Sequence, residues 1–143
     1  MKTEITLCFD FGNSRKKLAV FSNKKIIAER ILYTDTSGEI ETLLQEFKPQ
    51  KSILSSVINH NPGIEDTLKE KTHFHKLSVA TKLNFTAPVG KPETIGADRL
   101  AIAAAAVHFF PKKNNLVIGL GSCITYNFIS QQHEFLGGAI SPG

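Results

Sequence analysis

The sequence predicts an α/β domain with a mixed sheet, followed by the first strands of a second, similar domain. Three strand-like runs joined by short turns open the chain, at residues 4–10, 16–22 and 25–32, which indicates antiparallel hairpins. Later strand-like runs alternate with helical patterns, and such crossovers place strands parallel to one another. The opening pattern of an apolar strand, a glycine turn and a second strand then returns from Leu116 onward.

The elements after the opening hairpins follow in a definite order. They are a helix, a buried strand, a short helix, a strand and a long apolar helix, at residues 36–47, 52–58, 61–71, 73–79 and 98–110. Thr36 and Glu39 have the spacing of a capping box, and Asn61 before Pro62 is typical of a helix start. Because the last helix has almost no polar face, we expect it to be buried between layers. This order of elements is that of ribonuclease-H-like domains.

A long loop and a polar linker mark the organisation of the second half. Residues 80–95 contain two prolines and no hydrophobic period, which predicts a loop with a function. Residues 111–115 form a basic polar linker. We therefore expect an N-terminal domain at 1–111 and the incomplete start of a second domain at 112–143.

The composition is that of a globular protein. Of the 143 residues, 41% are apolar and 21% charged, and the formal charge is +4. The lysines are scattered without an arginine-rich window, so nucleic-acid binding is not indicated. No stretch approaches about 18 apolar residues, and the N-terminus lacks a signal-peptide pattern. We expect a cytoplasmic protein without membrane contact.

Two cysteines and one pair of histidines are of residue types that can bind metals. Cys8 and Cys123 lie in apolar runs without ligand spacing, which predicts small buried hydrophobic residues in a reducing compartment. His73 and His75 would share one face of a strand. Both a metal pair and a plain exposed strand face remain open for them.

The turn after the first strand has the residues of a phosphate site. Gly12 allows a close approach of the backbone, and the amides of Asn13, Ser14 and Arg15 can point at phosphate oxygens. Asp10 cannot bind an anion itself, so its role there would be to hold a hydrated divalent cation. The alternative is an ordinary hairpin, because the same residue types dominate turns.

The segment Ile118-Gly119-Leu120-Gly121-Ser122 repeats this pattern. Two such hairpins suggest two related half-domains that face one nucleotide. Asp98 and Arg99, at the start of the apolar helix, could serve as a proton acceptor and an anion clamp. Alternatively, Asp98 only caps the helix and Arg99 is a surface cation.

Four motifs occur together in order: Asp10-x-Gly12-Asn13-Ser14, Gly96-Ala97-Asp98-Arg99, the second glycine turn, and Gly137-Gly138-x-Ile140-x-Pro142-Gly143. On these motifs the sequence resembles type III pantothenate kinase, a family also known as Bvg accessory factor and described as a transcriptional regulator. The resemblance implies the fold of the acetate and sugar kinase/Hsp70/actin superfamily, with ATP between two ribonuclease-H-like domains. The implied reaction is ATP-dependent phosphorylation of pantothenate to 4'-phosphopantothenate, the first step of coenzyme A biosynthesis.

The resemblance also implies residue roles. Asp10 would lie at the Mg2+ that accompanies ATP. The nucleotide phosphates would be bound by Gly12, Asn13, Ser14, Lys17, Gly121 and Ser122, together with Asp10. Pantothenate would be bound by Gly96, Ala97, Asp98 and Arg99, with Asp98 as the catalytic proton acceptor.

Several positions depart from the family pattern. Gly119 stands where the family has the Asp that binds a monovalent cation, K+ or NH4+, so that cation is doubtful here. Asn127 replaces a common Asp, and Val89 replaces a tyrosine that contacts substrate. Family members run on well beyond residue 143, as homodimers. We therefore expect little or no kinase activity from the 143-residue chain by itself.

Two other functions are alternatives to the kinase. A catalytically degenerate regulatory or nucleotide-binding protein is favoured by Gly119. A transcription factor that contacts DNA directly is not supported, because no helix-turn-helix pattern or arginine cluster is present.

Overall fold

The structure is a computed structural model that describes residues 3–143. By packing, the chain divides into one unit that ends at Lys76 and a second unit, Leu77–Gly143. The first unit contains β1 (Ile5–Phe11), β2 (Lys16–Ser22), β3 (Lys25–Leu32), α1 (Ser37–Phe47), β4 (Lys51–Ser56), α2 (Pro62–Lys71) and β5 (His73–Lys76). The second contains the 3-10 turn Pro92–Thr94, α3 (Ala97–Phe109), β6 (Asn115–Leu120), β7 (Cys123–Ile129) and β8 (Phe135–Pro142).

The first unit is built on a five-stranded sheet in the order β3-β2-β1-β4-β5. The hairpins β1-β2 and β2-β3 are antiparallel, whereas β4 is parallel to β1 and β5 is parallel to β4. The predicted mixed sheet is therefore confirmed. The antiparallel half follows from the short turns, and the parallel half follows from the helical crossovers through α1 and α2.

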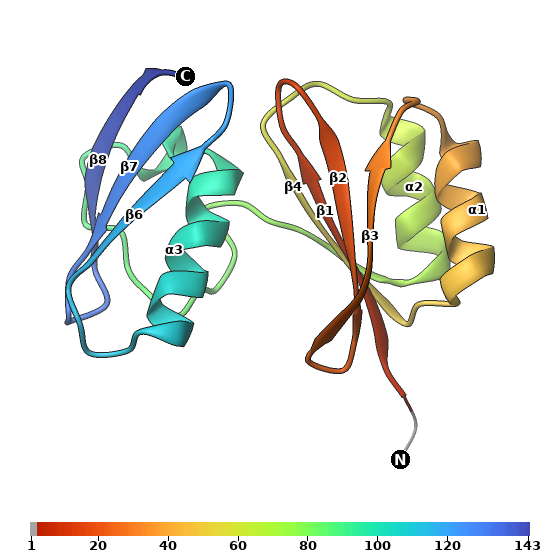
Figure 1. The fold of residues 1–143 in the computed structure, drawn as a ribbon, viewed down its shortest axis with the longest axis horizontal. Helices are drawn as coiled ribbons and strands as arrows, with labels where there is room; N and C mark the ends of the chain where they lie inside the picture. The colour runs from red at the N-terminus through yellow and green to blue at the C-terminus, as the bar shows by residue number, and fades with distance from the viewer. Residues whose placement is uncertain (1–2) are drawn as a thin grey trace. The chain divides into compact units, whose positions relative to one another are not determined.

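Helices α1 and α2 cover one face of this sheet (Figure 1). Their apolar sides, represented by Ile40 and Leu68, pack on alternating residues of the strands such as Phe9, Phe11 and Leu54. Because side chains alternate across a strand, Asp10 points to the opposite face of the sheet. The core thereby determines on which face of the sheet the candidate acidic residue lies.

The second unit has a three-stranded antiparallel sheet, β6-β7-β8, with α3 packed on one face (Figure 1). The core contains one side of α3 together with residues of the long loop and the sheet: Leu77, Phe85, Ile95, Leu100, Ala103, Ala106, Val107, Ile129 and Phe135. The predicted burial of the whole helix was wrong, because Ala105 and His108 are exposed and Phe109 is 71% exposed. Small alanine side chains let one side pack closely while the other stays open.

Packing places α3 with the second sheet, so the compact units divide earlier in the chain than residue 111. The limits 1–111 and 112–143 are expected boundaries of two ribonuclease-H-like domains, and they stay a prediction. No helix within residues 3–143 is long and apolar enough to cross a membrane.

Local details correct several expectations. The Thr36 side chain makes no capping hydrogen bond. Instead, the Glu39 carboxylate accepts hydrogen bonds from the Tyr33 and Thr34 amides and from the Thr34 hydroxyl, so it holds the segment before the helix. The Asn61 cap is confirmed, since its side chain accepts from the Gly63 amide at 2.9 Å. The strands expected at 52–58 and 73–79 end earlier, at Ser56 and Lys76.

The cysteines are less buried than predicted. Cys8 is half-buried and Cys123 is exposed. Cys8 lies on the sheet face that α1 and α2 do not cover, and Cys123 begins β7 at the end of a turn. His73 and His75 are both exposed on β5.

Candidate functional site

The first predicted phosphate turn joins β1 to β2. The Gly12 amide donates a hydrogen bond to the Arg15 carbonyl at 3.0 Å, which closes the turn. An added Cβ at Gly12 would lie 3.4 Å from that carbonyl oxygen, an ordinary van der Waals contact, so the turn itself does not require glycine there. Asn13, Ser14 and Arg15 are exposed at the tip. The turn therefore presents polar and basic groups to solvent, as contact with an anion requires.

Asp10 and Lys17 face one another across the hairpin and form an ion pair, with Lys17 Nζ 3.2 Å from Asp10 Oδ2. Their side chains are 47% and 57% exposed, respectively. On its other side Asp10 lies in register with Ser55 of β4, whose buried hydroxyl makes no hydrogen bond within residues 3–143. Asp10 thus lies between a cation and an unpaired hydroxyl on the sheet face opposite α1 and α2.

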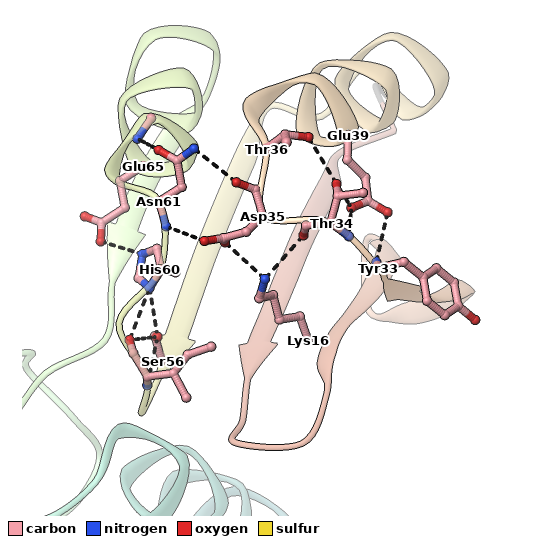
Figure 2. A network of polar contacts seen from close by, with 12 residues as sticks. Lys16, Tyr33, Thr34, Asp35, Thr36, Glu39, Ser56, His60, Asn61 and Glu65 are labelled. Atoms are coloured by element: carbon pink, nitrogen blue, oxygen red, sulfur yellow. Dashed lines mark hydrogen bonds and ion pairs between the residues drawn. The ribbon is translucent and has the colours of Figure 1, made fainter.

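The side chain of Lys16, which follows the turn, is bound by other residues of the first unit. Its Nζ donates to Asp35 Oδ1 at 3.0 Å and to the Thr34 carbonyl at 3.3 Å (Figure 2). Asp35 Oδ2 in turn accepts from the Asn61 amide at 2.9 Å. The segments that precede α1 and α2 are therefore both linked to β2, the strand that follows the turn Gly12–Arg15.

His60 anchors the adjacent segment. Its Nδ1 lies 3.1 Å from Ser56 Oγ and its Nε2 lies 3.0 Å from Glu65 Oε1 (Figure 2). Burial alone would raise the pKa of Glu65, but the hydrogen bond and charge of Lys76, with His60 and Lys69, lower it overall. The His60 ring packs edge-on against Phe11 at 5.3 Å between ring centroids. Sequence reasoning missed this network: Ser56 and Glu65 lie only four and five residues from His60, but no spacing rule signals that the chain brings these side chains together.

The second unit holds the Gly96–Arg99 motif at the start of α3. Gly96 is the N-cap residue, and the Arg99 amide donates to Asp98 Oδ1 at 2.8 Å. Asp98 therefore accepts a hydrogen bond from a free amide at the helix start, as the capping alternative predicted. Asp98 is half-buried, and its Oδ2 makes no hydrogen bond or ion pair in the described part of the chain. One carboxylate oxygen is fixed and the other is available.

Arg99 is held inside the second unit and is not a free surface cation. Its Nε donates to Asn127 Oδ1 at 2.6 Å, and its Nη2 donates weakly to the Tyr126 carbonyl at 3.4 Å. The guanidinium carbon lies 5.5 Å from the centre of the Phe135 ring. In the sequence Asn127 is only a departure from a family pattern, and no spacing links it to Arg99.

The second glycine turn connects β6 to β7 through Gly121 and Ser122, both exposed. Gly119 lies just before it and is paired with Thr125 of β7. An added Cβ at Gly119 would lie 2.6 Å from Thr125 Oγ1 and 3.4 Å from Ile102 Cδ1. Ile102 lies one turn after Asp98, so the start of α3 lies over this strand.

The predicted residues thus form three groups. Asp10, Lys17 and the turn Gly12–Ser14 are together in the first unit. Gly96–Arg99 and the turn Gly121–Ser122 belong to the second unit. A hollow between α1 and α2 in the first unit contains none of these residues; it is lined by Glu41, Leu44, Gln45, Lys48, Pro49 and Lys71.

Comparison with known proteins shows the family. The family model of type III pantothenate kinase matches residues 6–143 of this chain. The chain belongs to the type III pantothenate kinase family. A type III pantothenate kinase of Christiangramia forsetii is 39% identical over 141 residues, which cover 97% of this chain and 58% of that protein. Its counterpart from Flavobacterium johnsoniae is 35% identical over 140 residues, which cover 96% and 57%.

This chain therefore spans about 58% of the length of such a type III pantothenate kinase. A solved structure from Campylobacter jejuni, a protein assigned to the Baf family of transcriptional activators, is 28% identical with a TM-score of 0.53. It matches 96% of this chain, which covers 54% of that structure. The resemblance drawn from the four motifs and the ribonuclease-H-like arrangement of the first sheet are both confirmed.

The two expected cations differ in how they fit. An Mg2+ ion bound with nucleotide phosphates needs only one or two carboxylates, and the accessible Asp10 supplies one. The monovalent cation does not fit at position 119, because Gly119 has no carboxylate and Thr125 Oγ1 fills the space where a side chain would begin. No group of three His, Cys, Asp or Glu residues suited to a metal exists among residues 3–143.

Proposed function

We propose that the protein containing this chain is an ATP-dependent kinase that phosphorylates pantothenate to 4'-phosphopantothenate, the first step of coenzyme A biosynthesis. The observation that carries the proposal is the start of α3 in a chain of this family. There an amide fixes one oxygen of Asp98, and side chains fix the neighbouring Arg99. These contacts support the proposal that Asp98 is the base and Arg99 the anion clamp.

Asp98 acts as the proton acceptor in this proposal. The hydroxyl oxygen of pantothenate attacks the γ-phosphorus of ATP, its proton passes to Asp98 Oδ2, and ADP leaves. The hydrogen bond from the Arg99 amide to Oδ1 sets the orientation of the carboxylate. Arg99 contributes a delocalised cation that binds a substrate carboxylate or the oxygens of the transferring phosphoryl group.

The two glycine turns bind the phosphates. In the first turn the proposed phosphate contacts are Asn13, Ser14 and the backbone at Gly12, and in the second turn they are Gly121 and Ser122. Asp10 would hold Mg2+, which when bound neutralises phosphate charge. Lys17 now forms an ion pair with Asp10, so it can turn toward the phosphates when Asp10 takes the metal.

The proposal extends to the location and assembly of the protein. We place the reaction in the cytoplasm and expect a homodimer of the whole protein. A Baf-like regulatory role is the competing outcome, and the similarity to the Campylobacter jejuni structure makes it worth testing.

Substitution of the proposed base tests the function. In the whole protein we expect Asp98→Asn to lower pantothenate-dependent ADP release by about 10²- to 10⁴-fold, because general-base catalysis contributes on that order. Nucleotide binding should be unchanged. Asp66→Asn, at an exposed position of α2, is the matched control and should keep full turnover. Absence of pantothenate-dependent turnover from the folded, unsubstituted protein would instead support regulation.

A further inference from the structure

We propose that Asn127 is a positioning residue for Arg99, and that its neutrality leaves the full charge of Arg99 for an anionic ligand group. The inference rests on the proposed function, because it deepens the role of Arg99 in that site. The contacts that carry it lie entirely within the second unit. They join the first turn of α3 to the middle of β7 and to the facing part of β8.

Asn127 is fully buried, and its side chain is held from three directions. Its Nδ2 donates to the Val117 carbonyl at 3.1 Å and to Thr125 Oγ1 at 3.2 Å. Both donors therefore point at oxygen acceptors, so the amide has one favourable orientation, with Oδ1 toward Arg99. A side chain set in this way can determine where the guanidinium lies.

Two contacts orient the guanidinium of Arg99, one at its edge and one at its face. The edge contact is the 2.6 Å hydrogen bond from Nε to Asn127 Oδ1, and the face contact is with the Phe135 ring. Nη1 makes no hydrogen bond within residues 3–143, and Nη2 makes only the weak one to Tyr126. Donors of the Nη1 and Nη2 fork therefore remain for two oxygens of a carboxylate or phosphoryl group.

Gly138 lies next to the guanidinium of Arg99. It pairs with Asn127 across the sheet. An added Cβ at Gly138 would collide with the Tyr126 carbonyl oxygen and lie 3.0 Å from Arg99 Nη2. Glycine at this position thus lets β8 and the guanidinium both approach β7, which explains one residue of the Gly137-Gly138 motif.

The chemistry of Asn127 determines the charge at the site. An aspartate there would accept the same hydrogen bond but would form an ion pair, which lowers the attraction of Arg99 for a further anion. An apolar residue would leave the Nε donor buried without a partner. Asparagine orients Arg99 without neutralising it, so we infer a preference for a ligand with an anionic pair of oxygens.

Two variants of the whole protein, Asn127→Leu and Asn127→Asp, test the inference against Asn115→Leu. Asn115 donates only to the Phe110 and Lys113 carbonyls, so its replacement is the same chemical change in the same sheet without contact to Arg99. The first readout is the NMR signal of the Arg99 Nε proton in 15N-labelled protein. We expect slow exchange with water in the unsubstituted protein, Asn115→Leu and Asn127→Asp, and fast exchange in Asn127→Leu.

The second readout separates KM from kcat, with pantothenate and with its analogue whose carboxylate is reduced to an alcohol. Loss of a charged hydrogen bond is worth about tenfold to a hundredfold. We expect Asn127→Leu to lose this factor in kcat/KM for pantothenate. A rise in KM that is absent with the neutral analogue assigns Arg99 to the carboxylate, whereas a fall in kcat with both assigns it to the phosphoryl group.

The two proposals fail in different ways. Equal proton exchange and equal kinetics in Asn127→Leu and Asn115→Leu would overturn the positioning role. If Asn127→Leu does not fold, the unsubstituted protein still decides: an Arg99 Nε proton that exchanges as fast as that of a solvent-exposed arginine would contradict the geometry. An unsubstituted protein with a protected Nε proton but no pantothenate turnover would refute the proposed kinase while supporting the Arg99–Asn127 contact.

Discussion

The hydroxyl of Thr125 occupies the space that a side chain at Gly119 would need, with 2.6 Å between Thr125 Oγ1 and the position of an added Cβ. The two residues are directly paired across β6 and β7. Thr125 Oγ1 also accepts a hydrogen bond from Asn127. The glycine and the threonine are thus matched to one another, and the contact extends to the residue that orients Arg99.

We expect Gly119→Asp to destabilise the protein by about 1–3 kcal/mol, because the new side chain forces Thr125 out of its position. Thr125→Ala removes the obstructing oxygen, so adding it to Gly119→Asp should restore part of the lost stability. Urea unfolding of the two single variants and the double variant gives the coupling energy. Additive losses would show that the two side chains do not compete for one space.

Turnover by the whole protein should not depend on a monovalent cation. Position 119 supplies no carboxylate, and the Thr125 hydroxyl is a neutral ligand that already accepts a hydrogen bond. ADP release should therefore be equal in potassium, ammonium and tetramethylammonium chlorides at the same ionic strength. A strong requirement for potassium or ammonium would place the cation at groups other than residue 119.

Asp10→Asn should weaken nucleotide binding in the presence of Mg2+ by roughly tenfold or more and leave binding without Mg2+ unchanged, because the amide loses the charged metal ligand. The fold should persist, since an exposed ion pair such as that with Lys17 contributes only about 0–1 kcal/mol. Calorimetric titration with and without Mg2+ measures both affinities. Lys17→Met is the control, as it removes the ion pair but keeps the carboxylate.

The stability of the first unit should fall in acid through Glu39. Burial alone would raise the pKa of Glu39, but hydrogen bonds from Thr34 and Tyr33 and the charge of Lys16 lower it overall. The unfolded state therefore binds the proton more readily than the folded state. The stabilisation is complete above the ordinary glutamate pKa of about 4.3 and is lost as the pH falls through the lower folded-state pKa.

Glu39→Gln should accordingly be less stable than the unsubstituted protein at pH 7, and the difference should shrink as the pH falls below about 4. Urea unfolding at a series of pH values measures this difference. Glu41→Gln, at an exposed position of the same helix, is the control. A gap between the Glu39 variant and the parent that stays constant down to pH 3 would contradict the assignment.

Local patterns predicted most of the fold because they act over a few residues. The opening hairpins, the Asn61 cap and the alternation of strands with helices are all confirmed. The expected burial of α3 was wrong, because an apolar composition does not tell which sides of a helix find a partner. The predicted capping box between Thr36 and Glu39 was wrong for a related reason. The Glu39 carboxylate accepts hydrogen bonds from the Tyr33 and Thr34 amides instead of the amide of Thr36.

For the candidate site, the sequence by itself determined the residue types and their order: an acidic strand end, a glycine turn, an Asp-Arg pair at a helix start and a second glycine turn. Short motifs carry this information because turns and helix starts need particular side chains. Only the tertiary structure decided that Arg99 meets Asn127, that Thr125 fills the space at Gly119, and that Lys16 is held by Asp35. Contacts of this kind depend on strand register and on how α3 lies on its sheet, which join residues that no local spacing rule connects.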